Sequence, residues 1–496
     1  MIDQQQFEQL KAAGFNYIPV FRRRLADTDT PLSVFARLRQ HQLAYLFESV
    51  EGGEQWARFS MIGIGQDAVL QCNSGIMQVQ HNNELQQFPC SDPFTYIQQF
   101  QSQFKVPSAD LIPALPVFTG GLVGYFGYDA VRYIEPRLKN PPANDVLGLP
   151  DIWLMLSKTV VVFDNLSDTM FLITHADTQQ DNAFDNACQR LDQLEQQLAQ
   201  PVKLEAKPHT APVFKSLTGQ DNYLSTVEVV KEYIRAGDVM QVVPGHRMVS
   251  DFDGDPLSVY RALRHLNPSP YLFMVQGSTL ADQKPFYLIG SSPEILSRLE
   301  NGIATVRPLA GTRPRGKTPS EDIALEQDLL SDTKEIAEHL MLIDLGRNDV
   351  GRVSKIGKVR VTERMVIERY SHVMHIVSNV EGEVRDDVTA MEVFKATFPA
   401  GTLSGAPKIR AMEIIDEVEP VKRGVFGGAV GYLGWHGEMD TAIAIRTAVI
   451  RDQQVQVQAG AGLVADSIPE AEWNETMIKA RAVIKAVELS ANGLDI

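Results

Sequence analysis

The chain has 496 residues, 44% of them apolar and 22% charged, a balance typical of a globular protein with one large or two smaller domains. Its 46 Lys and Arg against 62 Asp and Glu give a net charge of −16, which disfavours nucleic acid and anionic lipid as partners because no local basic patch offsets it. The sequence has no signal-like N-terminus, no apolar run of about 18 residues and only three widely spaced cysteines, so we expect a cytoplasmic protein without a membrane span, a disulfide framework or a clustered cysteine metal site.

The first part of the chain alternates β-rich runs with turn signals, and few helices are expected there. One helix is indicated over 181–200, where apolar residues recur at helical spacing. Residues 201–217 mix Pro, Lys and small polar residues without periodicity, which is typical of a linker. The expected domains are therefore 1–200 and 218–490, and the strand and helix signals that alternate through the second part predict an α/β or α+β fold.

A helix is predicted over 332–349, and it pairs Glu335 with Glu338 one turn apart. The positions expected to face inward are Ile336, Leu340 and Ile343. Alone, such an E-x-x-E pair is more often a solvated charged face than a site.

A second acidic face is predicted near the C-terminus, where Ser467 and Glu470 have the spacing of a capping box. In the helix that follows, Glu472 and Glu475 are again one turn apart. Its apolar stripe is expected to contain Trp473, Met477, Ala480, Ile484 and Val487. Two such helices could together hold one hard cation, because Mg²⁺ takes few carboxylates and keeps open positions for water or substrate.

Glycine-rich segments at 307–316 and 401–410 could approach a carboxylate closely, although a basic surface turn and a capped connection are the ordinary alternatives. His375 lies in an apolar strand, where a hydrogen-bonded core histidine is the usual case. Glu294 follows Gly-Ser-Ser-Pro and could serve as a general acid if burial raises its pKa; otherwise it is a solvated turn residue.

Taken in order, several motifs resemble the chorismate-utilising enzymes, and among them the component I (large-subunit) family of anthranilate synthase. The matching segments are SSPE, P-x-AGTRPRG, AEHLMLIDLGRND, SHVMHIVS, FPAGTLSGAPK, GGAVGY, IRTAV and AGAGLVADS-x-P-x-E-x-x-E-x-x-x-K. The resemblance extends from about residue 47 to 487 and implies a two-sheet β sandwich flanked by helices. It also implies synthesis of anthranilate and pyruvate from chorismate and ammonia, the first step of tryptophan biosynthesis.

The resemblance assigns roles residue by residue. Mg²⁺ would be bound by Glu338 and Glu475, with Glu335 and Glu472 in support. Chorismate would be held by Gly311, Thr312, Thr402, Phe426, Arg446, Gly460, Gly462 and Lys479. Glu294 would protonate the departing 4-hydroxyl, and His375 would assist the loss of pyruvate.

Two positions bear on the product. Isochorismate and salicylate synthases carry a water-activating Lys where this chain has Gln241, and an amide cannot act as that base. Aminodeoxychorismate synthases commonly carry a nucleophilic Lys where this chain has Ala310, so that enzyme is the disfavoured alternative. A third alternative is a non-catalytic chorismate or tryptophan sensor, which would have no need of Glu294, Glu338 and Glu475. At Phe426, relatives often have a Tyr, and we expect its loss to weaken substrate binding modestly.

The resemblance further implies feedback inhibition by tryptophan and a separate partner. The inhibitor pocket would be lined by Phe47, Glu48, Ser49, Pro270, Tyr271, Val430 and Tyr432. No cysteine has the glycine neighbours of a glutaminase nucleophile, so a glutamine amidotransferase subunit would supply ammonia, in a heterotetramer of two large and two small subunits.

Overall fold

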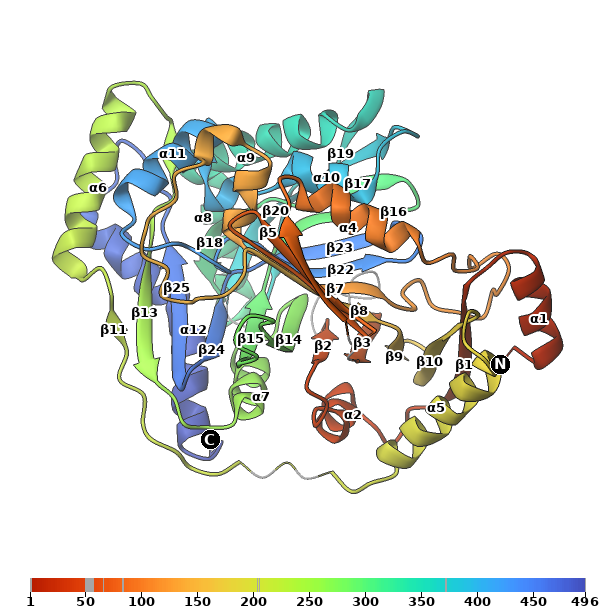
Figure 1. Ribbon diagram of the computed structural model, residues 1–496. Helices are drawn as coiled ribbons and strands as arrows, with labels where there is room; N and C mark the ends of the chain where they lie inside the picture. The colour runs from red at the N-terminus through yellow and green to blue at the C-terminus, as the bar shows by residue number, and fades with distance from the viewer. Residues whose placement is uncertain are drawn as a thin grey trace.

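The computed structural model describes residues 2–49, 58–65, 67–82, 84–202, 204, 206–370 and 373–495. Its centre is formed by two large antiparallel sheets, and helices cover their edges and outer faces (Figure 1). This arrangement confirms the predicted sandwich of two sheets with flanking helices. Within the described ranges, no helix combines the length and the apolar character needed to cross a membrane.

The first sheet has eleven described strands. Their order is β1 (Tyr17–Leu25), β10 (Thr169–Asp177), β9 (Thr159–Asp164), β3 (Phe59–Ile64), β2 (Ala44–Glu48), β14 (Tyr271–Ser278), β15 (Pro285–Ser292), β24 (Thr447–Arg451), β25 (Gln454–Gly460), β13 (Gly245–Asp251) and β11 (Lys215–Ser216).

The second sheet has twelve described strands. Their order is β18 (Leu309–Pro314), β20 (Val373–Val384), β17 (Ile303–Val306), β16 (Ile295–Glu300), β23 (Met439–Ile443), β22 (Ala429–Gly434), β7 (Gly121–Phe126), β8 (Ile152–Ser157), β4 (Ala68–Asn73), β5 (Ile76–His81) and β6 (Glu84–Pro89), with β19 (Ser354–Arg369) paired to β20. A short separate ladder pairs β12 (Gln241–Val242) with β21 (Gly405–Ala406).

Aromatic side chains from both sheets meet in the core. Trp153 on β8 packs edge-on against Phe286 on β15, with ring centroids 5.1 Å apart, and Tyr125 on β7 contacts the same ring. The Trp153 indole N–H donates to the Ser278 carbonyl at 3.0 Å, so this buried polar group is satisfied across the interface.

The α-helices are α1 (Gln4–Ala12), α2 (Pro31–Leu38), α4 (Pro93–Ser102), α5 (Ala183–Leu198), α6 (Gln220–Arg235), α7 (Pro256–Leu266), α8 (Pro319–Ser331), α9 (Thr333–Gly351), α10 (Ala390–Thr397), α11 (Lys408–Val418) and α12 (Pro469–Ala491). Helix α12 packs against β25, α6 and α7, whereas α9 packs against β18, β19 and β20 (Figure 1). Short 3₁₀ turns include η3 (Gly401–Leu403).

Both sheets contain strands from both parts of the chain. In the first sheet β2 pairs with β14, and in the second β7 pairs with β22. The segment 201–217 therefore separates two stretches of sequence, but each stretch contributes strands to each sheet. Their shared core positions the candidate site and the cavity described below relative to each other.

Several helix predictions are confirmed and others are wrong. The helices expected at 181–200 and 332–349 are present as α5 and α9, whereas α1, α2 and α4 were not indicated by the sequence. The predicted capping box of Ser467 and Glu470 does not form, because α12 begins at Pro469 with Ile468 as its N-cap residue. Proline suits the first helical position because its missing N–H would have no partner there.

Two residues that helical periodicity predicted on the packed faces of their helices are instead exposed. Leu340 on α9 and Met477 on α12 both point to solvent, and their neighbours His339, Leu342 and Thr476 are buried in their place. The packed stripe is thus rotated relative to the predicted one, which is a small angular error at 3.6 residues per turn.

Candidate active site

Helix α9 presents two glutamates from its first turns. The Asp332 side chain caps the helix by accepting the backbone N–H groups of Lys334 at 3.1 Å and Glu335 at 3.3 Å. Burial raises the pKa of Glu335, and the nearby carboxylate of Glu338 raises it further. These carboxylates therefore lie close enough to repel each other.

Glu338 meets residues from two other elements. The Gln241 side-chain N–H on β12 donates to Glu338 Oε1 at 2.9 Å, whereas Gln241 Oε1 has no hydrogen-bond partner among the described residues. A Cβ atom on Gly462 would lie 2.6 Å from Gln241 Nε2 and 3.6 Å from Glu338 Oε1. Glycine at 462 thus leaves room for this contact.

Helix α12 presents the second pair of glutamates. Lys479 Nζ lies 2.7 Å from Glu475 Oε1 and donates to the Gly460 carbonyl at 3.1 Å, which joins the helix to the end of β25. Burial raises the pKa of Glu472, and Glu475 adds to this effect, whereas the Ser467 hydroxyl and Lys334 on α9 oppose it. Lys334 of α9 therefore lies near enough to Glu472 of α12 to act on its pKa.

No set of three His, Cys, Asp or Glu side chains within the described ranges is arranged as a metal-binding cluster. The four glutamates instead form two pairs, one on each helix. Such pairs match a cation that takes one or two carboxylates and fills its other positions with water or substrate oxygen.

Glu294 lies on the turn between β15 and β16 and is buried. The Thr402 hydroxyl donates to Glu294 Oε1 at 3.2 Å. Burial raises the pKa of Glu294 to about 8, although Thr402, the Leu309 N–H, Arg446 and Lys479 all favour its ionised form. At neutral pH this carboxyl group is consequently protonated and able to act as an acid.

His375 lies on β20 with its ring held from one side. Its Nδ1 is 3.0 Å from both the Gly311 carbonyl and the Thr312 hydroxyl, and because a carbonyl only accepts, Nδ1 carries the proton. Nε2 is buried without a partner in the described part of the chain. Burial and, to a lesser degree, the charge of Arg446 lower the pKa of His375 to about 4, so the ring is neutral with a free acceptor nitrogen.

Gly311 occupies a bulge in β18, where the pairing with β20 shifts register between Ala310 and Thr312. Its φ of +70° is unfavourable for a residue with a side chain. The segment expected to be a loop at 307–316 is thus largely a strand, and its bulge aims the Gly311 carbonyl at His375.

Arg446 has a left-handed backbone (φ +50°) between β23 and β24. Its guanidinium has no hydrogen-bond or ion-pair partner among the residues that the structure describes. Burial lowers its pKa, whereas Tyr370 and Glu294 oppose this effect. A half-buried cation without a matched anion is well suited to binding a carboxylate.

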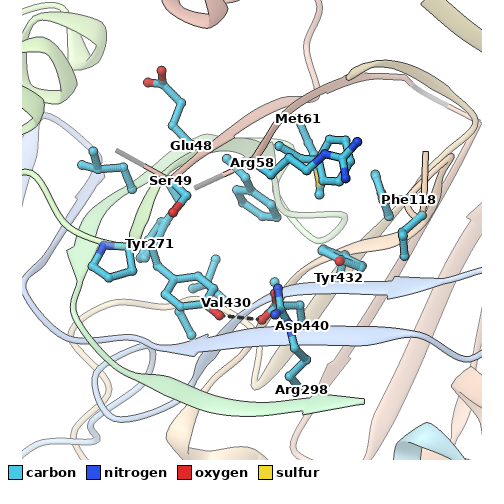
Figure 2. A pocket seen from close by; sticks show the side chains of 18 of the residues that line it. Glu48, Ser49, Arg58, Met61, Phe118, Tyr271, Arg298, Val430, Tyr432 and Asp440 are labelled. Atoms are coloured by element: carbon cyan, nitrogen blue, oxygen red, sulfur yellow. Dashed lines mark hydrogen bonds and ion pairs between the residues drawn. The ribbon is translucent and has the colours of Figure 1, made fainter. Parts of the chain in front are cut away.

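A separate cavity of about 380 Å³ lies between the two sheets, near β2 and β14 of the first sheet and β22 of the second (Figure 2). All seven residues predicted for an inhibitor pocket line it, namely Phe47, Glu48, Ser49, Pro270, Tyr271, Val430 and Tyr432. Further lining residues that the sequence did not indicate include Arg58, Met61, Phe118, Arg298 and Asp440. Part of the predicted region, 50–57, lies outside the described residues.

Several polar groups of this cavity are held by hydrogen bonds. Tyr271 donates to Asp440 Oδ1 at 2.9 Å, and Arg298 donates to Asp440 Oδ2 at 2.8 Å. The Glu48 carboxylate points away from the cavity, toward Arg264 and Tyr260 (Figure 2). Glu48 therefore contributes mainly its backbone and stem to the wall.

A family model for chorismate binding enzymes matches residues 43–485. The chain belongs to this family. Among curated relatives, anthranilate synthase component 1 of Acinetobacter calcoaceticus is 76% identical over 99% of both chains. The protein of the same name from Pseudomonas aeruginosa is 52% identical over 100% of both.

Solved structures agree with this membership. Anthranilate synthase component I from Streptococcus pneumoniae has a TM-score of 0.76 at 36% identity, covering 88% of this chain and 95% of its own. The menaquinone-specific isochorismate synthase MenF of Escherichia coli has a TM-score of 0.71 at 18% identity, covering 97% and 98%, and shares the fold.

In this chorismate binding enzyme, Phe426 borders the glycine-rich strand end. Its ring would lie 3.2 Å from a Cβ on Gly245, which pairs with Gly460, and it lies 5.5 Å from Arg423 Cζ. The ring thus packs at the edge of the site, beside a buried cation.

The sequence did not indicate Tyr370 as a site residue. Its ring lies 5.7 Å from that of His375, its hydroxyl donates to Glu368 at 2.7 Å, and Arg446 influences its pKa. The feature of the sequence that could have indicated Tyr370 is its position just before the strand that carries His375.

Proposed function

We propose that the chain converts chorismate and ammonia into anthranilate and pyruvate, as the first step of tryptophan biosynthesis. The observation that carries this proposal is the buried Glu294 carboxyl group, which accepts a hydrogen bond from Thr402 and whose pKa is raised by burial to about 8. Hydroxide is a poor leaving group, so displacement of the 4-hydroxyl of chorismate requires such an acid.

Chorismate is a dianion, and the proposed site offers cations and backbone groups for its two carboxylates. Arg446 has no competing anion, and Lys479 holds Glu475 and the Gly460 carbonyl at the other side. The remaining proposed contacts are Gly311, Thr312, Thr402, Phe426, Gly460 and Gly462. Together they would place the ring between Glu294 and His375.

We assign Mg²⁺ to the two glutamate pairs, with Glu338 and Glu475 as ligands and Glu335 and Glu472 in support. The residues fit this ion, because burial and, within each pair, the neighbouring carboxylate raise the pKa of Glu335 and Glu472, and a bound cation would offset this accumulated negative charge. When bound, the ion would offset the charge of a substrate carboxylate. Gln241 would orient Glu338 through its N–H.

The residues then divide the reaction between them. Glu294 donates a proton to the 4-hydroxyl, which departs as water while ammonia adds at C2. Gln241 cannot deprotonate a water molecule, which favours ammonia as the nucleophile. His375, neutral and with a free Nε2, is placed to accept a proton during the loss of pyruvate, which leaves an aromatic ring.

The cavity lined by Ser49, Tyr271 and Tyr432 is proposed to bind tryptophan as a feedback inhibitor. Its volume of about 380 Å³ and its aromatic walls suit an indole, and Asp440 and Arg298 supply charged groups for an amino acid. We further assign ammonia supply to a separate glutamine amidotransferase subunit, and a cytoplasmic location in which the three free thiols stay reduced.

The direct test is a product assay on the purified chain. Chorismate, Mg²⁺ and ammonium at alkaline pH should yield anthranilate, seen by its blue fluorescence, together with an equal amount of pyruvate. Glutamine in place of ammonium should yield no product until the partner subunit is added. A 4-amino product, isochorismate or no turnover with ammonium would overturn the proposal.

A further inference from the structure

A small cavity adjoins Glu294 on the side of α9. It has a volume of about 40 Å³, and its lining includes Glu294, Thr402, Leu345 and Asp349. A cavity of this size has room for a water molecule, and its two acidic side chains offer that water hydrogen-bond partners. The proposed function uses Glu294 and Thr402 but gives no role to the other end.

The other end is formed by an ion pair between α9 and α11. Lys408 Nζ lies 2.7 Å from Asp349 Oδ2, and Asp349 is buried. Burial raises the pKa of Asp349, which Lys408 opposes. The Lys408 side chain remains 13% exposed, so the pair can exchange protons with solvent at that edge.

The proposed chemistry leaves Glu294 in need of a proton after every turnover. Its proton departs with the 4-hydroxyl oxygen as water, and the buried carboxyl group is left ionised. The protons released from the added ammonia and from C2 appear at a different ring carbon, where His375 is proposed to accept them. Glu294 must regain a proton from another source before the next turnover.

We propose that the Asp349–Lys408 pair reprotonates Glu294 through water in this cavity and the Thr402 hydroxyl. The pair gives a proton to the water, the water protonates the hydroxyl oxygen as Thr402 passes its own proton to Glu294 Oε1, and solvent restores the proton of the pair. No bond other than O–H and N–H bonds is broken or formed. The proposal rests on the proposed role of Glu294 as the acid.

Pre-steady-state kinetics separate this relay from a merely structural ion pair. In Asp349→Asn the first turnover uses the proton already on Glu294, so anthranilate should appear in a burst of one equivalent per site at the rate of the unmodified chain. Later turnovers should be slower by about tenfold or more. This slow phase should show a larger solvent deuterium isotope effect than the steady state of the unmodified chain.

Two further variants serve as a control and as an independent test of the relay. Asp344→Asn, which removes an exposed carboxylate of the same helix that pairs with Arg347 at 3.0 Å, should give the kinetics of the unmodified chain. Leu345→Phe fills the cavity without removing a charge and should reproduce the burst, which covers the case in which Asp349→Asn does not fold.

Equal slowing of the first and later turnovers would contradict the relay, as would an Asp349→Asn or Leu345→Phe enzyme without a burst. A slow phase that is insensitive to deuterium would indicate delayed product release and would also contradict it. Glu294→Gln distinguishes the two proposals: an undiminished rate in that variant would remove the acid role itself, whatever the outcome at Asp349.

Discussion

Glu294 is the residue on which the proposed acid step depends. Its turn between β15 and β16 buries the carboxyl group, and burial outweighs the four groups that favour ionisation. A carboxyl group with a pKa near neutrality can both hold a proton and give it up within one reaction. The same burial makes the group dependent on an internal route for its protons.

Replacing Glu294 by Gln keeps the shape of the side chain and removes the proton. We expect kcat to fall by on the order of 100- to 10,000-fold with little change in the KM for chorismate, because the step lost is proton donation. Steady-state kinetics at saturating ammonium measure both constants. A fall confined to KM would show that Glu294 binds substrate and does not act as the acid.

The pH profile gives a second measurement on the same residue. The active form is protonated, so kcat/KM at a fixed concentration of free ammonia should be maintained below the Glu294 pKa of about 8 and fall as pH rises through it. Glu294→Gln should lack this alkaline limb. An identical limb in the variant would assign it to another group.

Phe426 occupies a position where the family often has a tyrosine hydroxyl, so restoring that hydroxyl should strengthen substrate binding. Phe426→Tyr places a donor at the edge of the site, and we expect the KM for chorismate to fall about fivefold, which corresponds to ~1 kcal/mol. Thermal unfolding serves as the control, because the ring packs beside the buried Arg423 and an altered melting temperature would indicate repacking. An unchanged KM would argue against a substrate contact at this position.

At the scale of elements, the candidate site depends on three segments that approach one another closely at Gly462. Strand β12 supplies Gln241, helix α9 supplies Glu338, and the turn after β25 supplies Gly462. The turn can approach so closely only because residue 462 lacks a side chain.

Gly462→Ala tests this convergence. Its Cβ would lie 2.6 Å from Gln241 Nε2, so the amide must move and its hydrogen bond to Glu338 must lengthen or break. We expect the Mg²⁺ concentration for half-maximal activity to rise severalfold, because Glu338 loses its orientation. Gly351→Ala, at the end of α9 where no atom lies within 4 Å of the added Cβ and φ is not positive, controls for glycine replacement in general. An unaltered Mg²⁺ requirement in Gly462→Ala would separate Gln241 from the metal site.

The elements also show where sequence patterns were sufficient. The helical period of 332–349 predicted α9 closely, because local propensity and burial agree there. In α12 the capping pattern of Ser467 and Glu470 was misleading, since Pro469 determined where the helix begins. Leu340 and Met477 were placed inward because periodicity gives a face only to within part of a turn.

At the scale of the whole molecule, the cavity near Ser49 and the candidate active site share β22 and its neighbours. Strand β22 carries Val430 and Tyr432 in the cavity wall, and Phe426 precedes it in the chain. The structure thus offers a short physical route by which a bound inhibitor could change the active site.

We expect Ser49→Phe to abolish inhibition by tryptophan while preserving most of the ammonium-dependent activity. The larger side chain would occupy part of the cavity of about 380 Å³ without reaching Glu294 or Arg446. Activity titrated with tryptophan measures the effect. Ser102→Phe, at the exposed end of α4, is the matched control. Retained inhibition in Ser49→Phe would remove the pocket assignment.

The arrangement of the sheets could not be obtained from sequence periodicity. The pairing of β2 with β14, more than two hundred residues apart, depends on which edges are free in the folded chain, and no local signal encodes that choice. The proposed site residues, by contrast, were predicted from family motifs. Tyr370, Asp349 and Lys408 were not predicted as site residues. Their proposed roles depend on which groups they contact, and those contacts form only in the folded chain.

The central claim is that helices α9 and α12 share one divalent ion beside the substrate. Binding of Mn²⁺ in place of Mg²⁺, followed by electron paramagnetic resonance with anthranilate present, measures this directly. We predict one ion per chain, with Glu338→Gln and Glu475→Gln each weakening its binding about tenfold or more. Glu488→Gln, at an exposed position of α12, should have no effect. An ion that depends on only one of the two helices, or on neither, would contradict the account.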